Sequence, residues 1–354
     1  MSAPMLASTS ILCVIPGLIW PATGVADALS PYDLPGLSAL LARVEEHIAP
    51  PCPLDAWLAE QFGLTGELPF AALRLAGDGI AMPDSDALWV CADPVSLRFA
   101  RQHLLLDAPE TLALQADEMD SLLRDLNTTF ADIGEFSRTS PEHAYLMLKP
   151  EHADKLPVTL APLADVDSRP VAQFQAKGEH AAWWSKLNNE LQVFCHNHPV
   201  NTAREARRAP ALNALWLWGL GSLPPTLASP HPQMAARQGT PNAIFNGLSR
   251  LAHCKPAAFD ARQPAAWSLI DDLHAPAQQR DTGAWSNALQ KLDAEVFVPL
   301  VHQLRSGRLH HLRIVAPGDT ALTRLDISPT PRWKFWQRGA SKAQLIARLG
   351  RPAE

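Results

Sequence analysis

The stretch Asn189–Gly221 is NELQVFCHNHPVNTAREARRAPALNALWLWGLG. A helical pattern ends before Pro199, because proline excludes the residue before it from helical geometry. A short polar helix follows, then the apolar strand Leu215–Trp218, and Gly219-Leu220-Gly221 predicts a tight turn after that strand. Helices that lead directly into a buried strand indicate a mixed α/β fold. Since His, Asn, Arg and Trp side chains concentrate here and are sparse elsewhere, we expect the functional site in this stretch.

The rest of the chain alternates between strand and helix patterns, which predicts an α/β architecture. The predicted strands are Ile11–Ile15, Leu88–Ala92, Thr111–Leu114, Ala144–Leu148, Leu215–Trp218 and Leu312–Ala316. The predicted helices are Leu34–His47, Leu54–Phe62, Ala116–Thr129, Ala181–Asn197 and Trp285–Leu304. Residues 150–180 and 222–242 are rich in proline and small residues, so we expect them to be irregular connectors.

The composition is that of a globular protein with an uneven charge distribution. The 354 residues suffice for one large domain or two smaller ones, and the formal net charge is −6. From Thr330 onward there are six Lys or Arg residues against one Glu, so the body before this tail is strongly acidic. Because phosphate neutralisation requires a basic face, the body is not expected to be a general nucleic-acid binder.

The cysteines and the N-terminus favour a cytoplasmic protein. Five cysteines lie far apart without paired spacing, which predicts reduced core residues rather than disulfides. The apolar Ile11–Ile15 could belong to a signal peptide, but the first ten residues lack Lys and Arg, and Pro16-Gly17 interrupts the run. We therefore predict a buried first strand. No apolar run approaches the roughly 18 residues of a transmembrane helix.

Several polar residues of the Asn189–Gly221 stretch allow more than one interpretation. His196-x-His198 has the spacing of half a zinc site, but a helix end where histidine complements the dipole is favoured. Asn201 is well placed to cap the next helix. Arg204, with Arg207 and Arg208, lies near a helix start, where positive charge is unfavourable. An anionic ligand, an internal acid or plain solvation would each account for this cluster.

The turn and the tryptophans of this stretch are also open to two interpretations. Gly219-x-Gly221 after a strand invites a dinucleotide site, but Pro224 stands where the third glycine belongs, so that fingerprint fails. What remains is a tight turn whose amides could approach a ligand. Trp216 and Trp218 alternate on one face of the strand. They would either line a pocket or pack against the Trp183-Trp184 helix.

These motifs resemble a known family. His198-Pro199-Val200-Asn201, Arg204, Asn213-Ala214 and Gly219-x-Gly221, followed by Pro224, are similar in order and type to a segment of the archaeal-type cofactor-independent phosphoglycerate mutases. Ala209 departs from that pattern, which has glycine. The likeness extends more weakly over residues 88–325. The chain also resembles proteobacterial phosphoglycerate-mutase-like proteins of the Rpf-type regulatory group, which share the motif ADPV found at Ala92–Val95 and a Trp/Arg-rich end.

The resemblance implies an α/β fold with an alkaline-phosphatase-like core and an inserted α+β domain, in reduced form. On this basis residues 1–87 and 256–329 form the core. Residues 88–255 form the inserted domain that carries the HPVN and LWLWGLG motifs. Residues 330–354 form a basic aromatic tail.

The departures from the family decide the expected function. The resemblance implies two metal ions held by Asp and His at strand ends, plus a serine that carries the phosphoryl group. Here the first strand runs into Ile15-Pro16-Gly17 and the last into Ala316-Pro317-Gly318-Asp319, where Asp-Gly and Asp-His are expected. Asp271, Asp272 and His274 match the remaining Asp/His pair only partly. We therefore expect no metal cofactor and assign no catalytic residue.

The resulting prediction is a cytoplasmic, mutase-like protein without two-metal phosphoryl transfer. It would bind a small phosphorylated or carboxylated metabolite and have a regulatory role. The expected binding residues are His198, Asn201, Arg204, Asn213, Trp216, Trp218, Gly219 and Gly221.

Two alternatives stay open. The first is an active phosphoglycerate mutase, an isomerase, or a phosphatase with rearranged ligands, which would need Mn²⁺ or Mg²⁺. The second is an interaction protein that uses Arg332-Trp333-Lys334-Phe335-Trp336, where cations alternate with aromatics as suits an anionic surface or a partner. The competing interpretation is a tail whose tryptophans pack back on the body.

Overall fold

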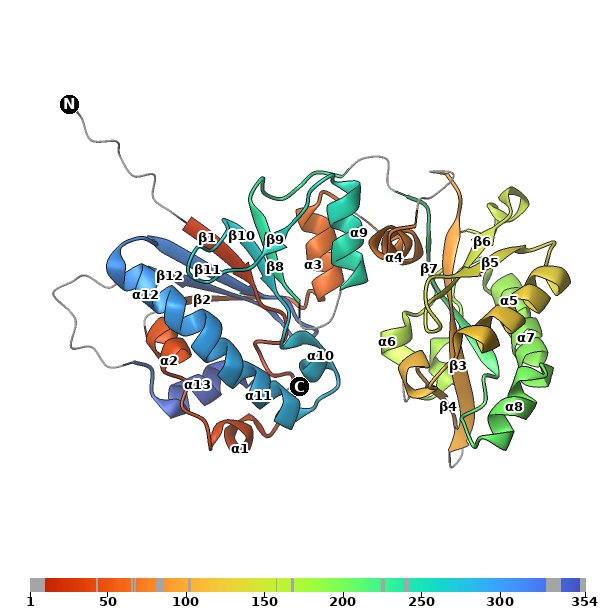
Figure 1. Cartoon of the computed structure of the whole chain (residues 1–354), viewed down its shortest axis with the longest axis horizontal. Helices are drawn as coiled ribbons and strands as arrows, with labels where there is room; N and C mark the ends of the chain where they lie inside the picture. The colour runs from red at the N-terminus through yellow and green to blue at the C-terminus, as the bar shows by residue number, and fades with distance from the viewer. Residues whose placement is uncertain are drawn as a thin grey trace. The chain divides into compact units, whose positions relative to one another are not determined.

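The computed structural model describes residues 10–350, except 43, 65, 67, 81–85, 101–102, 157, 167–168, 224–226, 239–241 and 329–338. Pro224 and Arg332–Trp336, which the sequence singled out, lie outside the described residues. The chain divides into two compact units, which are treated separately below (Figure 1). Unit 1 comprises Met1–Gly63, Ala228–Asn242 and Ala252–Glu354. Unit 2 comprises Leu64–Leu227 and Ala243–Leu251.

Unit 1 is built on a mixed seven-stranded sheet in the order β2-β12-β11-β1-β10-β8-β9. The strands from β11 to β9 are parallel, whereas β12 and β2 are antiparallel to their neighbours. The strand bounds are β1 Ser10–Val14, β2 Val44–Ala49, β8 Met234–Arg237, β9 Ala257–Ala258, β10 Trp267–Ile270, β11 His311–Ala316 and β12 Leu322–Ile327. Parallel neighbours place the carboxyl ends of β1, β10 and β11 at one edge of the sheet.

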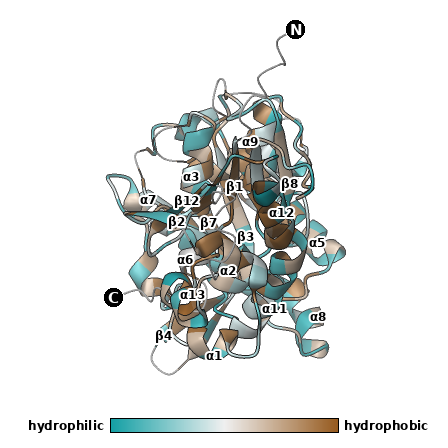
Figure 2. Ribbon diagram, turned by 90° about the vertical axis from the view of Figure 1, so that its left-hand side faces the viewer, coloured by the Kyte–Doolittle hydropathy of each residue, from teal (hydrophilic) through white to brown (hydrophobic). Residues whose placement is uncertain are grey.

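The core of unit 1 lies between this sheet and its helices (Figure 2). Ile11, Cys13 and Ile314 of the sheet pack with leucines of the helices, and all three are buried. The helix bounds are α1 Val25–Leu29, α2 Pro35–Leu41, α3 Leu54–Gln61, α10 His274–Gln278, α11 Thr282–Leu292, α12 Val298–Ser306 and α13 Lys342–Leu349. A single π-helical turn, Asp293–Phe297, joins α11 to α12. There Asp293 accepts hydrogen bonds from two backbone amides at the start of α2.

Unit 2 contains a five-stranded sheet in which the long β3 pairs with β4, β6 and β7. Helices α5 and α7 cover one face through buried apolar stripes, as Met119 and Trp184 illustrate. The strand bounds are β3 Trp89–Ala100, β4 His103–Asp107, β5 Gly134–Arg138, β6 Ala144–Leu148 and β7 Ala214–Gly221. The helix bounds are α4 Phe70–Asp78, α5 Ala116–Thr129, α6 Leu163–Val166, α7 Ala181–Asn197, α8 Val200–Ala206 and α9 Ala243–Leu251.

The α/β class predicted from the sequence is confirmed, and α5, α7 and β6 have their predicted bounds. Three predictions are wrong. The expected irregular connector 222–242 contains β8, which pairs in parallel with β10. Helix α2 stops at Leu41, and the second half of the predicted helix Leu34–His47 belongs to β2, because it pairs with β12. The predicted strand Thr111–Leu114 falls on a 3₁₀ turn, Pro109–Thr111, and the neighbouring strand is β4.

The units divide the chain differently from the segments expected from the family resemblance. Helices α4 and α9 belong to unit 2, since they pack on each other so closely that Gly77 and Gly247 leave no room for a side chain. The last described helix, α13, belongs to unit 1 rather than to a separate tail. Its Leu345 and Leu349 are part of the unit 1 core. In the described parts of the chain, no helix is both long enough and apolar enough to cross a bilayer.

Candidate functional site

Arg204, the cation expected to bind an anionic ligand, is completely buried inside unit 2. Its guanidinium donates to Glu118 Oε2 at 2.6 Å and to the carbonyls of Leu112 at 2.6 Å and Pro210 at 2.7 Å. Glu118 in turn accepts from Arg207 at 2.6 Å. The anion that compensates Arg204 is therefore an internal acid on α5, and the cluster ties α8 to that helix.

The amides and the histidine of the same stretch are also engaged internally. Asn201 donates to the carbonyls of Cys195 and Leu212 and accepts from the amide of Leu212. It lies inside α8, so the predicted N-cap role is wrong. Asn213 bridges the backbone N–H and C=O of Leu97. His198 is the C-cap of α7, and its Nε2 lies 3.0 Å from Asp125 of α5. The ring therefore links the end of α7 to α5.

The glycine turn and the tryptophans of β7 are close-packed. A Cβ on Gly219 would lie 2.7 Å from Phe70 Cβ, and one on Gly221 would lie 2.4 Å from Pro69 Cβ. The space beside both glycines is therefore filled by the start of α4 and is not open to a ligand. Trp216 donates to the carbonyl of Ala161. The predicted packing of the β7 tryptophans on the Trp183-Trp184 helix is wrong, because Leu215 and Leu217 face Trp184 instead.

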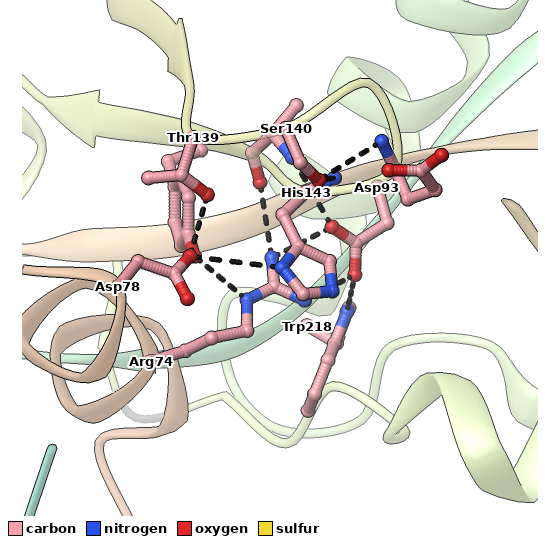
Figure 3. A network of polar contacts seen from close by, with 10 residues as sticks. Arg74, Asp78, Asp93, Thr139, Ser140, His143 and Trp218 are labelled. Atoms are coloured by element: carbon pink, nitrogen blue, oxygen red, sulfur yellow. Dashed lines mark hydrogen bonds and ion pairs between the residues drawn. The ribbon is translucent and has the colours of Figure 1, made fainter. Parts of the chain in front are cut away.

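A buried polar network connects α4 with three strands of unit 2 (Figure 3). Arg74 forms a bidentate ion pair with Asp93, at 2.6 and 2.8 Å, and Asp93 is 1% exposed. Trp218 donates to the same carboxylate at 2.7 Å. The Arg74 guanidinium also donates to Tyr145 Oη and lies 4.7 Å from the centre of that ring. Every group of the pair is thus satisfied, as a buried ion pair requires.

The rim of this network carries the carboxylate of Asp78. Thr139 and Tyr145 donate to it at 2.5 and 3.0 Å, and His143 Nδ1 lies 3.6 Å away. Burial opposes ionisation of Asp78, but hydrogen bonds from His143, Thr139 and Tyr145 outweigh it and hold its pKa at about 2. This arrangement fastens α4 to the β5–β6 loop. Trp218, a predicted binding residue, is held in the same network by Asp93.

A second polar group lies in unit 1, where the carboxyl ends of β1, β10 and β11 meet. There a cavity of about 80 Å³ opens, which we call the strand-end cleft. Its lining residues are Gly17, Ile19, Pro21, Pro53, Leu54, Asp55, His274, Ala277, Gln278, Pro317, Gly318, Asp319, Thr320 and Ala321. In open α/β sheets ligands bind at this edge. The volume suffices for several water-sized groups.

Backbone contacts shape the strand-end cleft. Cys52 and Gly318 exchange two backbone hydrogen bonds of 3.1 and 3.0 Å, which hold the start of α3 beside the loop after β11. Gly17 has φ +76°, and a Cβ there would lie 2.3 Å from the carbonyl of Leu273. Only glycine therefore lets the end of β1 approach the start of α10. As a result Asp55, His274 and Asp319 line one cavity.

The two ionisable side chains deepest in the strand-end cleft are shifted toward their uncharged forms. Burial, with a contribution from the charge of Asp319, raises the pKa of Asp55 to about 6. Burial lowers the pKa of His274 to about 4. Among the described residues, neither side chain has a hydrogen-bond partner. Perturbed groups that share a cleft are typical of functional sites. Of these two residues, the sequence analysis singled out only His274, because no local sequence motif includes Asp55.

The strand-end cleft does not fit a two-metal centre. Asp272 is held by Arg237 at 2.9 Å, and that arginine also pairs with Glu295. Neither Asp271 nor Asp272 lines the cleft. Within the ranges the structure describes, no three His, Cys, Asp or Glu side chains converge as metal ligands would. The adjacent Cys195 and His196 of α7 likewise diverge, one buried and the other exposed.

The molecule is thus a mixed α/β protein with an open sheet and a cleft at its carboxyl edge, plus a separate α+β unit. No family model matches the chain. A probable 2,3-bisphosphoglycerate-independent phosphoglycerate mutase of Geobacter sulfurreducens is 32% identical over 91 residues, which are 25% of this chain and 22% of that protein. The match therefore spans less than a quarter of the relative's length.

Two solved structures are similar along almost the whole chain. The PH0037 protein from Pyrococcus horikoshii has a TM-score of 0.58 at 14% identity, with coverage of 98% of this chain and 94% of that one. This likeness extends to the fold alone. The cofactor-independent phosphoglycerate mutase from Thermoplasma acidophilum has a TM-score of 0.42 at 13% identity, with coverage of 96% and 95%. The predicted likeness to phosphoglycerate mutases is confirmed at the level of local sequence similarity.

Proposed function

We propose that this protein binds a small phosphorylated or carboxylated metabolite in the strand-end cleft, without two-metal phosphoryl transfer. The observation that carries this proposal is that Asp55 and His274 line one cavity and make no side-chain hydrogen bond to another described residue. Polar groups of a cavity that lack internal partners favour a ligand that supplies the missing hydrogen-bond partners. The proposal moves the ligand to unit 1 from the Asn189–Gly221 stretch, because the side chains expected to bind there, from His198 to Trp218, have internal partners.

The chemistry of the cleft suits an anionic group that arrives together with a proton. A carboxyl with a pKa of about 6 is protonated at little cost and then donates a hydrogen bond to a phosphate or carboxylate oxygen. An approaching anion would raise that pKa further, because like charges disfavour each other. Neutral His274 offers a second donor through its ring N–H. The remaining charge, on Asp319, is exposed and screened by solvent.

We also propose that the protein does not catalyse two-metal phosphoryl transfer. Two-metal catalysis needs ligands that clamp both the attacking and the leaving oxygen. Pro16 and Pro317 follow β1 and β11 where the mutase pattern has acids. A regulatory protein that senses the metabolite is the role we favour, in line with the resemblance to the proteobacterial mutase-like group.

Titration calorimetry with 3-phosphoglycerate tests the proposal. Above pH 6, where free Asp55 is ionised, the affinity should fall roughly tenfold per pH unit, since binding takes up a proton. Asp55→Asn keeps a donor without the charge and should bind with little pH dependence. Asp27→Asn, in the first turn of α1, is the matched control and should behave as wild type. Binding without proton uptake, or no binding at pH 5.5, contradicts the proposal.

The second candidate is an enzyme with rearranged ligands. The observation in its favour is that an acid with a pKa of about 6 and a neutral imidazole share one cleft, as general acid–base catalysis requires. Mutase and phosphatase assays with added Mn²⁺, on wild type and on Asp55→Asn, separate the two candidates. Turnover that Asp55→Asn abolishes would establish the enzyme and refute the binding-only role.

A further inference from the structure

The last described helix packs against the segment that forms one wall of the strand-end cleft. Gly17, Ile19 and Pro21 line the cavity, whereas the intervening Leu18 and Trp20 are buried in the unit 1 core. We call Gly17–Pro21 the cleft wall. Successive residues of this segment thus face alternately toward the cavity and toward the core. Whatever holds Leu18 and Trp20 in the core also fixes the residues that face a ligand.

We propose that α13 is a strap that positions the cleft wall, so that docking of this helix controls whether the cleft can take its ligand. The inference rests on the proposed function for the identity of the ligand only. Its structural part stands on the contacts of α13 with unit 1.

Trp20 is the direct connection between the strap and the wall. Its backbone amide donates to the carbonyl of Leu349 at 2.6 Å, and Trp20 forms an isolated parallel bridge with Gly350. The Trp20 ring lies 5.2 Å from the ring of Trp285. Trp285 Nε1 in turn donates to the carbonyl of Gly17 at 2.7 Å. A continuous set of contacts therefore runs from the end of α13 to both ends of the wall.

The strap is fastened along its whole length. Lys342 donates to the carbonyl of Ser30 at the end of α1, and Arg348 donates to the carbonyl of Leu41 at the end of α2. Both cations thus satisfy carbonyls at helix C-termini, where positive charge is favourable. Just before α13, Ala340 and Ser38 exchange hydrogen bonds of 2.7 and 2.9 Å. At the far end Gly350 fits because a Cβ there would lie 2.3 Å from a methyl of Val25.

A helix as short as α13 depends on these contacts. It has eight residues, and isolated helices of this length are marginal in water. Its apolar side is limited to Leu345 and Leu349 with partly buried Ile346, so docking depends on these side chains together with the polar contacts of Lys342 and Arg348. The helix is therefore expected to exist in two states, docked and ordered or undocked and unfolded. Undocking removes the Trp20–Leu349 hydrogen bond and opens the wall to water.

The test compares two full-length variants that place a carboxylate on opposite sides of α13. Leu349→Asp puts it at a fully buried position and should undock the helix, whereas Ala347→Asp puts it on the exposed face and should not. Hydrogen exchange of the Trp20 amide reports docking. The ¹³C resonance of the Asp55 carboxyl, followed against pH, reports water entry into the cleft.

In Leu349→Asp we expect faster exchange of the Trp20 amide and a pKa of Asp55 that moves from about 6 toward its ordinary 3.8. The Ala347→Asp variant should show neither change. Faster exchange with an unchanged Asp55 pKa would overturn the proposal, as would an unchanged exchange rate of the Trp20 amide in folded Leu349→Asp. If Leu349→Asp fails to fold, Arg348→Ala weakens the same docking more mildly and is judged by the same two measurements. Neither measurement needs a ligand. If the wild-type protein does not bind 3-phosphoglycerate, only the proposed function is refuted.

Discussion

Replacing Arg204 by alanine should destabilise unit 2 strongly, because the guanidinium is enclosed and neutralises an almost buried acid. The side chain of Glu118 is only 10% exposed, and Arg204 has 0% exposure. Its removal leaves that carboxylate with Arg207 and the backbone amide of Gln115 as partners, and it leaves the carbonyls of Leu112 and Pro210 without their donor. Breaking a buried ion pair by deleting one member costs about 3–5 kcal/mol. We expect a loss of this size in the free energy of unfolding.

Arg207→Ala is the matched control for this prediction. Arg207 pairs with the same Glu118 at the same distance of 2.6 Å, but its side chain is 39% exposed. Exposed pairs contribute less than about 1 kcal/mol, so the control should stay close to wild type. Urea unfolding of both variants, together with 3-phosphoglycerate calorimetry, gives the comparison. A folded Arg204→Ala protein with wild-type stability and lost ligand affinity would refute the structural role and restore Arg204 as a binding residue.

Three further outcomes are expected. Asp319→Asn should lower the pKa of Asp55 below about 6 in an NMR titration, because it removes one of the two causes of the shift. Gly247→Ala should lower the melting temperature markedly, since its Cβ would lie 1.9 Å from a carbonyl oxygen of α4 and the helices would have to separate. Thr139→Val should raise the pKa of Asp78 from about 2 toward 3.8. The depressed pKa of Asp78 stabilises the fold above pH 3.8, and that stability is lost as the pH falls through about 2. In Thr139→Val this contribution should be smaller and its loss should be complete at a higher pH than in wild type, as acid unfolding followed by circular dichroism can show.

The elements that the sequence predicted correctly are those with a strong local signal. Helix α5 has a clear apolar stripe, and Pro199 limits α7. By contrast β2 is an edge strand whose charged residues hide its alternation. Its structure is decided by pairing with β12, which lies far away in the sequence. Local periodicity does not reveal a strand partner that is distant in the sequence.

The same distinction explains the candidate site. The motif residues of Asn189–Gly221 were found because they lie close together in the sequence, but proximity does not reveal that Glu118 of α5 neutralises Arg204. Arg74 resembles a solvated cation within an apolar helix, and only the fold brings Asp93 to it. The shift of Asp55 similarly depends on burial and on Asp319 of a distant loop. These are tertiary effects, and they cannot be predicted from the spacing of residues in the sequence.

The two groups of polar residues in this protein therefore differ in what they leave for a ligand. In unit 2 the guanidinium of Arg204 and the carboxylate of Asp93 are saturated by internal partners. Arg204 joins α8 to α5, and Asp93 joins α4 to β3 and β7. In unit 1 the half-buried side chains of Asp55 and His274 make no hydrogen bond to another described residue. Polar side chains that line a cavity without internal hydrogen bonds are available to a ligand. This difference, rather than the motif that the sequence displays most clearly, is the basis for the proposed ligand site in the strand-end cleft, to which the proposed docking of α13 is linked.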